Sequence, residues 1–501
     1  MAQVIVLREA QPRRAWGVRN ALVWLAIGAS IFALWMLNEG DYRVPLIGAG
    51  VAAVGLAVTA IPYTRQHREW LVFVLGLTYL VISISLLSEQ ERAILHYGVL
   101  LAFCLPIIAV PYDAGLLWEG DFKLYCYYFA WALATTSYSL APAFSAGRWI
   151  GAVLGFCAVL ACVAEVREAR DCERLFWRFL IACAIVIAAT LIAAVVLPTS
   201  ITWQTPADGL DPAALMRMRE QGIQLTGMDR FRGIFGNAND VGALMLITVS
   251  SALACWKNAP GRRRIFIGLV IALAIALAIW ADSRSPFVGL IVGAGLYVLW
   301  RYRLRGALAI GIVAIAALGV LTAFGQLDSY VTRGNVDTLT GRNDMWAYVV
   351  EKIRERPLSG YGYEVSGAIF NNRYFPLWFG PWDEGPHSSL HNGYLTHAIG
   401  VGVPATLLWC FIVIRPWIFA FRQKHDPWNL KTMGFLMVVP MLVYNLTEAA
   451  IGDFMNPVGF LFGLSWAVAE RYRTLELERQ RREQANALEA LPPAVRALRD
   501  A

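Results

Sequence analysis

Arginine and histidine side chains recur in the polar stretches of an otherwise apolar chain. Guanidinium groups bind phosphate through two parallel hydrogen bonds and keep their charge. Histidine accepts a proton near neutral pH. Arginines beside a histidine therefore suit a phosphate-bearing substrate whose reaction removes a proton from a hydroxyl group. Four motifs carry these residue types, and they are centred on Arg232, Arg284, Arg342 and His391.

The first motif is the segment Arg230–Asn239, which directly precedes an apolar stretch. Gly233 and Gly236 permit a tight approach of the backbone. Asn237 or Asn239 is placed to cap the helix that follows. The motif predicts either a helix entry with interfacial arginines or an anion site at the mouth of a helix bundle.

The second motif is Asp282–Pro286, a hinge of a few residues between two apolar stretches. A charged residue in such a place is costly unless it is paired or reaches water, and it is a functional candidate by default. Two interpretations stay open. Asp282 pairs with Arg284 in a simple short loop, or Arg284 binds an anion.

The third motif is Thr340–Trp346, which opens a predicted helix over Asp344–Arg356. Arg342 lies at the start of that helix, where free backbone N–H groups also favour an anion. Pro357 and the glycines that follow end the helix. The pattern fits an anion site and equally an ordinary amphipathic surface helix.

The fourth motif is His387–Tyr394. His391 is a candidate proton acceptor, and Asn392 is placed to orient it or the substrate. The six-residue spacing of His391 and His397 does not put both on one helical face, and the chain has no HExxH motif. These observations argue against a zinc site.

Composition shows what positions these motifs. The chain has 501 residues, of which 58% are hydrophobic and 16% charged, whereas soluble domains have about 45–50% apolar and about 25% charged residues. A soluble enzyme is therefore excluded. We predict an all-α, polytopic integral membrane protein with about 12–14 transmembrane helices, since its apolar runs approach or meet the roughly 17–25 residues that cross a bilayer. The expected spans are 22–38, 44–62, 70–87, 95–112, 125–143, 149–164, 177–198, 241–256, 265–281, 286–300, 306–325, 401–420, 432–450 and 454–469.

Three regions follow from this pattern. Residues 1–240 hold the N-terminal spans and a first polar segment at about 199–240. Residues 241–469 hold the catalytic membrane region, with a second polar segment at about 326–400 that we expect to form a large periplasmic loop with short helices. Residues 470–501 form a charged tail.

The 43 Lys and Arg residues set the orientation. Most fall in alternate short loops and at both termini, which places those segments in the cytoplasm. Both polar segments then face outward, toward the periplasm. The net charge of +7 is explained by topology, so no nucleic acid partner is needed.

The motifs occur in the order seen in the O-antigen ligase/polymerase superfamily, which the chain resembles over about residues 232–405. The matching segments are Arg232–Asn239, Ser283-Arg284, Gly341-Arg342 with Trp346, Pro357–Gly362, and His391-Asn392 with Gly402.

The resemblance implies an inverting, metal-independent glycosyltransferase of the bacterial inner membrane that uses no cofactor. It would transfer a glycan from undecaprenyl-pyrophosphate to an acceptor such as lipid A-core, on the periplasmic face and among membrane lipids. By the match, His391 would be the general base, and Arg284 and Arg342 would hold the pyrophosphate. The residues that would bind substrate are Arg232, Asn239, Asn392 and Tyr394.

Two alternatives stay open. One is an O-antigen or exopolysaccharide polymerase of the same superfamily. The other is a transporter or flippase of an anionic lipid or solute, which would also need many spans and an arginine-lined cavity. No internal repeat is apparent and polar residues gather at one face rather than at the midplane, which argues against a transporter.

Overall fold

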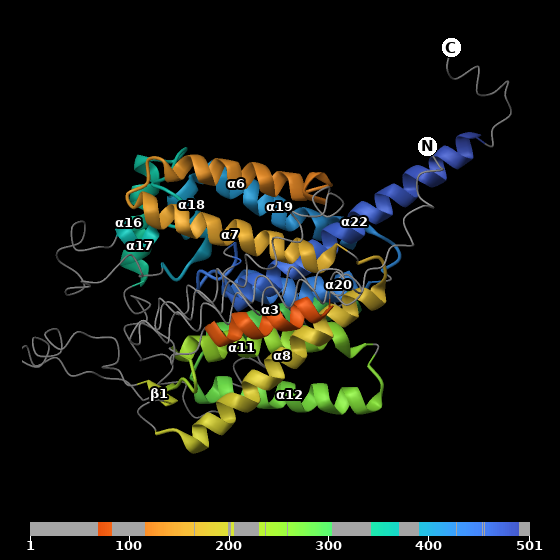
Figure 1. The fold of residues 1–501 in the computed structure, drawn as a ribbon, viewed down its shortest axis with the longest axis horizontal. Coiled ribbons are helices and arrows are strands. Elements are labelled where there is room, and N and C mark those ends of the chain that lie inside the picture. The colour runs from red at the N-terminus through yellow and green to blue at the C-terminus, as the bar shows by residue number, and fades with distance from the viewer. Residues whose placement is uncertain are drawn as a thin grey trace, which may run out of the picture.

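The computed structural model confirms the all-α, polytopic membrane fold. Helices make up 79% of the part of the chain that it describes (Figure 1). In that part, the only sheet pairs β1 (Trp203–Gln204) antiparallel with β2 (Arg230–Phe231). The structure describes residues 69–82, 116–164, 166–198, 202–204, 230–235, 237–257, 259–302, 342–369, 390–426, 428–452, 454 and 456–489.

Five helices within the described residues are long and apolar enough to cross a membrane. With a rise of 1.5 Å per residue, even 19 residues extend about 28 Å, close to the hydrocarbon thickness of a bilayer. They coincide with expected spans 149–164, 177–198, 241–256, 265–281 and 401–420. The five are α7 (Pro142–Val163), α8 (Ala169–Val196), α11 (Ala238–Trp256), α12 (Gly261–Trp280) and α19 (Val403–Arg422).

Further helices fall on other expected spans, at 70–87, 125–143, 286–300, 432–450 and 454–469. In the span expected at 432–450, the chain is helical without a break over residues 430–444, and the middle part of this stretch, η3, is π-helical. These elements are α3 (Glu69–Ile82), α6 (Phe122–Thr136), α13 (Ser285–Tyr302), α20 (Leu430–Met433), η3 (Gly434–Val438), α21 (Val439–Tyr444) and α22 (Pro457–Glu489). The short helix η1 (Leu116–Trp118) lies between expected spans. The expected spans at 22–38, 44–62, 95–112 and 306–325 lie outside the described residues.

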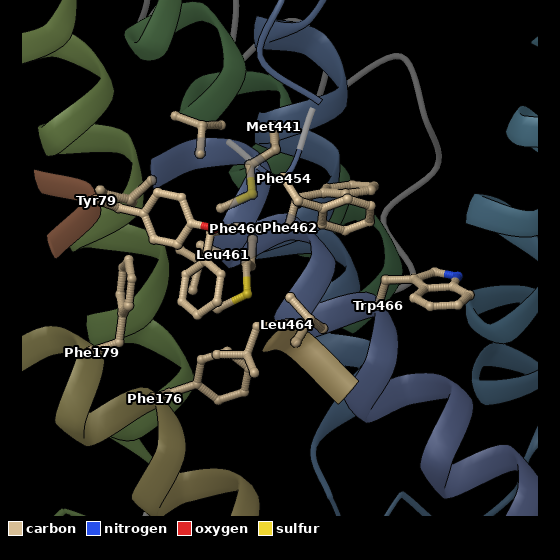
Figure 2. Packing of buried hydrophobic residues seen from close by; sticks show 14 of the residues in the cluster. Tyr79, Phe176, Phe179, Met441, Phe454, Phe460, Leu461, Phe462, Leu464 and Trp466 are labelled. Carbon is tan, nitrogen blue, oxygen red and sulfur yellow. The ribbon is translucent and has the colours of Figure 1, made fainter. Parts of the chain in front are cut away.

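The core of the bundle forms where the first half of α22 packs among helices from distant parts of the chain (Figure 2). The Tyr79 ring of α3 stacks on Phe460 of α22 at 4.9 Å, and Phe179 of α8 lies 6.0 Å from the same ring. All three side chains are buried. Aromatic contacts of this kind fix the register of α22 against α3 and α8.

The charged tail expected from residue 470 begins inside the bundle, because α22 continues through this position without a break. Glu470 and Arg473 are buried there and form an ion pair of 2.6 Å. Glu470 also accepts a hydrogen bond from the backbone N–H of Asp121, which precedes α6. The second half of α22 then projects from the bundle (Figure 1).

Short elements gather at the opposite end of the bundle from this projecting helix (Figure 1). They lie in the expected second polar segment, as predicted. They are α16 (Arg342–Glu355), α17 (Ser366–Ile369) and α18 (Gly393–Val401). This end of the bundle carries the motifs identified in the sequence.

Candidate functional site

His391 occupies a strained position just before α18. Its φ of 49° lies in the left-handed region, which is unfavourable for a residue with a Cβ and is common at functional sites. Asn392 follows as the N-cap of α18, and its side chain accepts a hydrogen bond from the Leu395 N–H at 3.0 Å. The cap fixes the chain direction at His391, whose side chain is 35% exposed.

A carboxylate orients the His391 ring. The Nδ1 atom of His391 lies 2.8 Å from Oε2 of Glu448, which belongs to the segment after α21. When Nδ1–H donates to this carboxylate, Nε2 carries the lone pair of the neutral ring. A carboxylate in this position fixes the tautomer and stabilises the ring once it gains a proton. The pair has the arrangement of a general base and its orienting group.

The second oxygen of Glu448 is also bound. Asn239, in the first turn of α11, donates from Nδ2 to Glu448 Oε1 at 3.1 Å, and Arg230 Nη2 donates to Asn239 Oδ1 at 2.8 Å. Asn237 caps α11, since its side chain accepts from the Asn239 N–H at 2.9 Å. Because Asn237 provides the cap, the Asn239 side chain is available to link Arg230 to Glu448 through hydrogen bonds.

Arg230 connects this network to the second motif. Its Nε donates to the carbonyl oxygen of Ala281 at 3.0 Å, and its Nη2 donates to that of Asp282 at 3.3 Å. Asp282 has a φ of 49° and pairs with Arg284, with 3.4 Å between Asp282 Oδ1 and Arg284 Nε. The turn between α12 and α13 thus presents Arg284, with its side chain 34% exposed, on the same network as His391.

The third motif lies beside His391 as well. Trp346 of α16 donates from Nε1 to the carbonyl oxygen of Leu390 at 2.9 Å. Arg342 begins the same helix one turn earlier. The start of α16 is therefore held against the residue that precedes His391.

Backbone contacts explain the glycines of the remaining motif. The N–H groups of Tyr361 and Gly362 donate to the carbonyl oxygens of Ile399 and Gly400 at 2.8 and 2.9 Å. Gly402 has a φ of 85°, and a Cβ there would collide with the backbone of Leu358. Pro357–Gly362 and the end of α18 therefore meet main chain to main chain, which requires glycine. This contact secures α18 behind His391.

Three other expected substrate-binding residues have structural contacts. Asn392 caps α18, as described above. The Tyr394 hydroxyl donates to the Leu442 carbonyl at 3.0 Å, which ties α18 to α21. Arg232 follows β2, is partly buried, and donates its backbone N–H to the Thr202 carbonyl at 2.9 Å.

His397 has a different environment from His391. It is buried, its Nδ1 lies 2.9 Å from the Tyr128 hydroxyl, and its ring lies 4.5 Å from that of Trp409. These contacts make it a packing residue between α18, α6 and α19. His387 lies outside the described residues. Within the described part of the chain, no group of His, Cys, Asp and Glu is arranged as metal ligands.

Sequence reasoning missed Glu448 and gave Arg230 no role. A signal for Glu448 was present, because it is the only charged residue of the expected span 432–450. An ionisable residue in an apolar span is a functional candidate by default. Arg230 and Asn239 precede residue 240, so the network draws on both of the first two expected regions.

Comparison with known proteins identifies one region of the chain. No curated protein matches the sequence. Residues 269–410 match the family described as O-Antigen ligase, and this stretch includes Arg284, Arg342 and His391. The expected resemblance is thereby confirmed for residues 269–410, over which the chain is similar to the O-antigen ligase superfamily.

Proposed function

We propose that this membrane protein is a glycosyltransferase that moves a glycan from undecaprenyl-pyrophosphate to an acceptor hydroxyl group. The family match supports the reaction class. The observation that carries the proposal is the 2.8 Å contact between His391 and Glu448. It pairs a base with an orienting carboxylate at the end of the bundle where the arginine motifs meet.

In the proposed reaction, the acceptor hydroxyl oxygen forms a bond to the anomeric carbon of the glycan. The bond from that carbon to the pyrophosphate oxygen breaks, and its electron pair leaves with undecaprenyl-pyrophosphate. The hydroxyl proton passes to His391 Nε2, and Glu448 stabilises the resulting imidazolium. A single displacement of this kind inverts the anomeric configuration, and the proposed steps use no metal or cofactor.

The leaving pyrophosphate needs positive charge. Arg284 lies on the turn between α12 and α13, which Arg230 connects by hydrogen bonds to the network around His391. Arg342 begins α16, and Trp346 of this helix donates a hydrogen bond to the residue before His391. Guanidinium groups suit this role because they bind phosphate oxygens in a fork and do not lose their proton. We assign the pyrophosphate to these two arginines. Arg232, Asn239, Asn392 and Tyr394 remain candidates for contacts with the glycan or carrier.

We place the reaction on the periplasmic face of the bacterial inner membrane, with both termini in the cytoplasm. The distribution of basic residues supports this orientation. The family description supports an O-antigen ligase, for which the acceptor is lipid A-core or a similar glycolipid. Polymerisation of the glycan is the alternative within the superfamily.

A deletion strain complemented with the wild-type chain or with His391→Ala tests the proposal. Its surface polysaccharide is separated on gels and its carrier-linked glycan is extracted. A ligase predicts that the variant strain lacks all long chains on lipid A-core and accumulates carrier-linked polymer. A single repeat unit on the core would show a polymerase instead, and unchanged lipopolysaccharide would exclude lipid A-core as the acceptor.

A further inference from the structure

A pocket of about 680 Å³ lies at the far end of the bundle from His391. Helix α11 starts at Ala238, next to Asn239, and ends at Trp256, and α13 starts at Ser285, next to Arg284, and ends at Tyr302. These helices of 19 and 18 residues place the pocket about 27 Å from the candidate site. Its lining residues are Leu253, Trp256, Lys257, Tyr297, Trp300, Arg301, Lys424, Asp426, Asn429, Lys431, Thr432 and Leu436.

The pocket is strongly basic. It contains four cationic side chains and one carboxylate, that of Asp426. This carboxylate accepts hydrogen bonds from the Leu430 and Lys431 N–H groups at 2.7 and 2.8 Å, so it caps the start of α20. Lys431 Nζ donates to the carbonyl oxygen of Gln423.

Within the described residues, no carboxylate pairs with any of the other three cations. Lys257, Arg301 and Lys424 are exposed, and none forms an ion pair with another side chain of the described residues. They come from the ends of α11, α13 and α19, so three separate helices bring their positive charges to one cavity. These three positive charges repel one another, and a bound anion would reduce that repulsion.

The remaining walls are aromatic and aliphatic. Trp256 and Trp300 are 41% and 40% exposed at the ends of their helices, where tryptophan favours the membrane–water boundary. Leu253 and Leu436 line the pocket one turn closer to the middle of the bundle, and Leu436 belongs to the π-helical η3. A π-helical turn within an α-helix often marks a functional position. The cavity therefore joins a cationic rim to an apolar wall.

We propose that this pocket binds the phosphate head group of an anionic glycerophospholipid, in the leaflet opposite to the candidate catalytic site. Basic pockets between membrane helices recognise such head groups, and tryptophan and leucine side chains contact the glycerol and the first part of the acyl chains. A soluble phosphate would satisfy the cations but would leave the apolar wall without a partner. The inference does not depend on the proposed transferase activity.

The test uses the full-length protein purified in a neutral detergent. Phosphatidylglycerol or phosphatidylcholine is added at the same mole fraction, and lipid adducts and the Tm are measured by native mass spectrometry and thermal unfolding. We expect retained phosphatidylglycerol adducts and a rise in Tm that phosphatidylcholine does not give.

A matched pair of variants locates the effect. The first carries Lys257→Gln, Arg301→Gln and Lys424→Gln. The control carries Arg170→Gln, Arg262→Gln and Arg481→Gln, which remove equal charge from exposed positions outside the pocket. All six side chains are exposed, so both variants should fold. We expect binding of phosphatidylglycerol to weaken by about tenfold or more in the first variant only.

Two results decide against the proposal or narrow it. Equal retention of phosphatidylglycerol by the wild type and the pocket variant would overturn it. A third arm adds glycerol 3-phosphate, which lacks acyl chains. Protection by this compound equal to that by the lipid would support the anion site and assign it to a soluble phosphate rather than to a lipid.

Discussion

Glu448 lies 57 residues after His391 in the sequence, yet its carboxylate is 2.8 Å from the Nδ1 atom of the histidine. The two residues belong to different elements, since His391 precedes α18 and Glu448 follows α21. Gly393 and Asn445 hold these elements together, because the Gly393 N–H donates to the Asn445 carbonyl at 2.9 Å. The pair is therefore built by tertiary contacts beside both residues.

Replacement of Glu448 by Gln should slow glycan transfer by up to about 10⁴-fold, the effect of the corresponding change beside the histidine of a catalytic triad. The amide does not stabilise a protonated ring, and it can also hold the wrong tautomer. The measurement is the initial rate in membranes with carrier-linked glycan at saturating concentration. Glu483→Gln, on the exposed part of α22, is the control. Equal rates for the two variants would remove Glu448 from the mechanism.

His391 and His397 should respond differently to replacement by alanine. His391→Ala should reduce transfer by about 10²–10⁴-fold, the usual contribution of a general base, and leave the Tm nearly unchanged. His397→Ala should cost about 1–3 kcal/mol of stability, because the buried Tyr128 hydroxyl loses its partner. Transfer rate and thermal unfolding of both variants are measured together. A fully active His391→Ala protein would refute the assignment of the base.

Arg284→Lys and Arg342→Lys should each lower transfer by about 10²-fold, because lysine keeps the charge but does not supply a planar fork for the pyrophosphate. Arg354→Lys is the matched control, since Arg354 is an exposed arginine on α16. Rates are compared with equal amounts of protein in the membrane. Near-normal transfer in both test variants would contradict the proposed binding of pyrophosphate.

Gly402→Ala should lower the free energy of unfolding by about 1–3 kcal/mol, because alanine is strained at a φ of 85°. Its Cβ would also collide with the Leu358 carbonyl group. Gly268→Ala is the control, because a Cβ at Gly268 has open space around it. Thermal unfolding of the purified variants measures the difference. Equal Tm values would show that the main-chain contact between Pro357–Gly362 and the end of α18 does not require glycine at position 402.

Topology is tested by cysteine labelling. Asn335 lies in the second polar segment, outside the described residues, and Glu483 lies on the exposed end of α22. Asn335→Cys should react with an impermeant maleimide added to cells, and Glu483→Cys should react only after the cells are lysed. The wild-type chain gives the background from its own cysteines. The reverse pattern would invert the proposed orientation.

Much of the fold was predictable because the periodicity of apolar residues and the length of an apolar segment can both be read from a short stretch of sequence. The expected spans at 241–256 and 265–281 match α11 and α12 closely. The stretch at 432–450 was expected as one span, but its helix ends at Tyr444. Asn445 accepts backbone hydrogen bonds from Ala450 and Ile451 there, so the chain turns and presents Glu448.

The candidate site was predictable only in part, because sequence patterns are local whereas the site is assembled from distant segments. Arg284 and His391 lie in short motifs that can be recognised within a few residues. The partner of His391 lies in a distant segment, and no spacing rule connects the two. The sequence allowed either Asn237 or Asn239 to cap α11. The contact of Arg230 with the turn at Ala281 places its guanidinium beside Asn239, so the Asn239 amide is the one that links Arg230 to Glu448.

The stretch that carries the family signature, residues 269–410, contains His391, the proposed base, but not Glu448, Asn239 or Arg230 of its hydrogen-bond network. Arg230 and Asn239 lie before this stretch, and Glu448 lies after it. We therefore expect that a gene segment encoding residues 269–410 alone does not confer the proposed activity. Recombination at either edge would separate His391 from its partners, so we expect inheritance and loss of the whole membrane bundle as one unit.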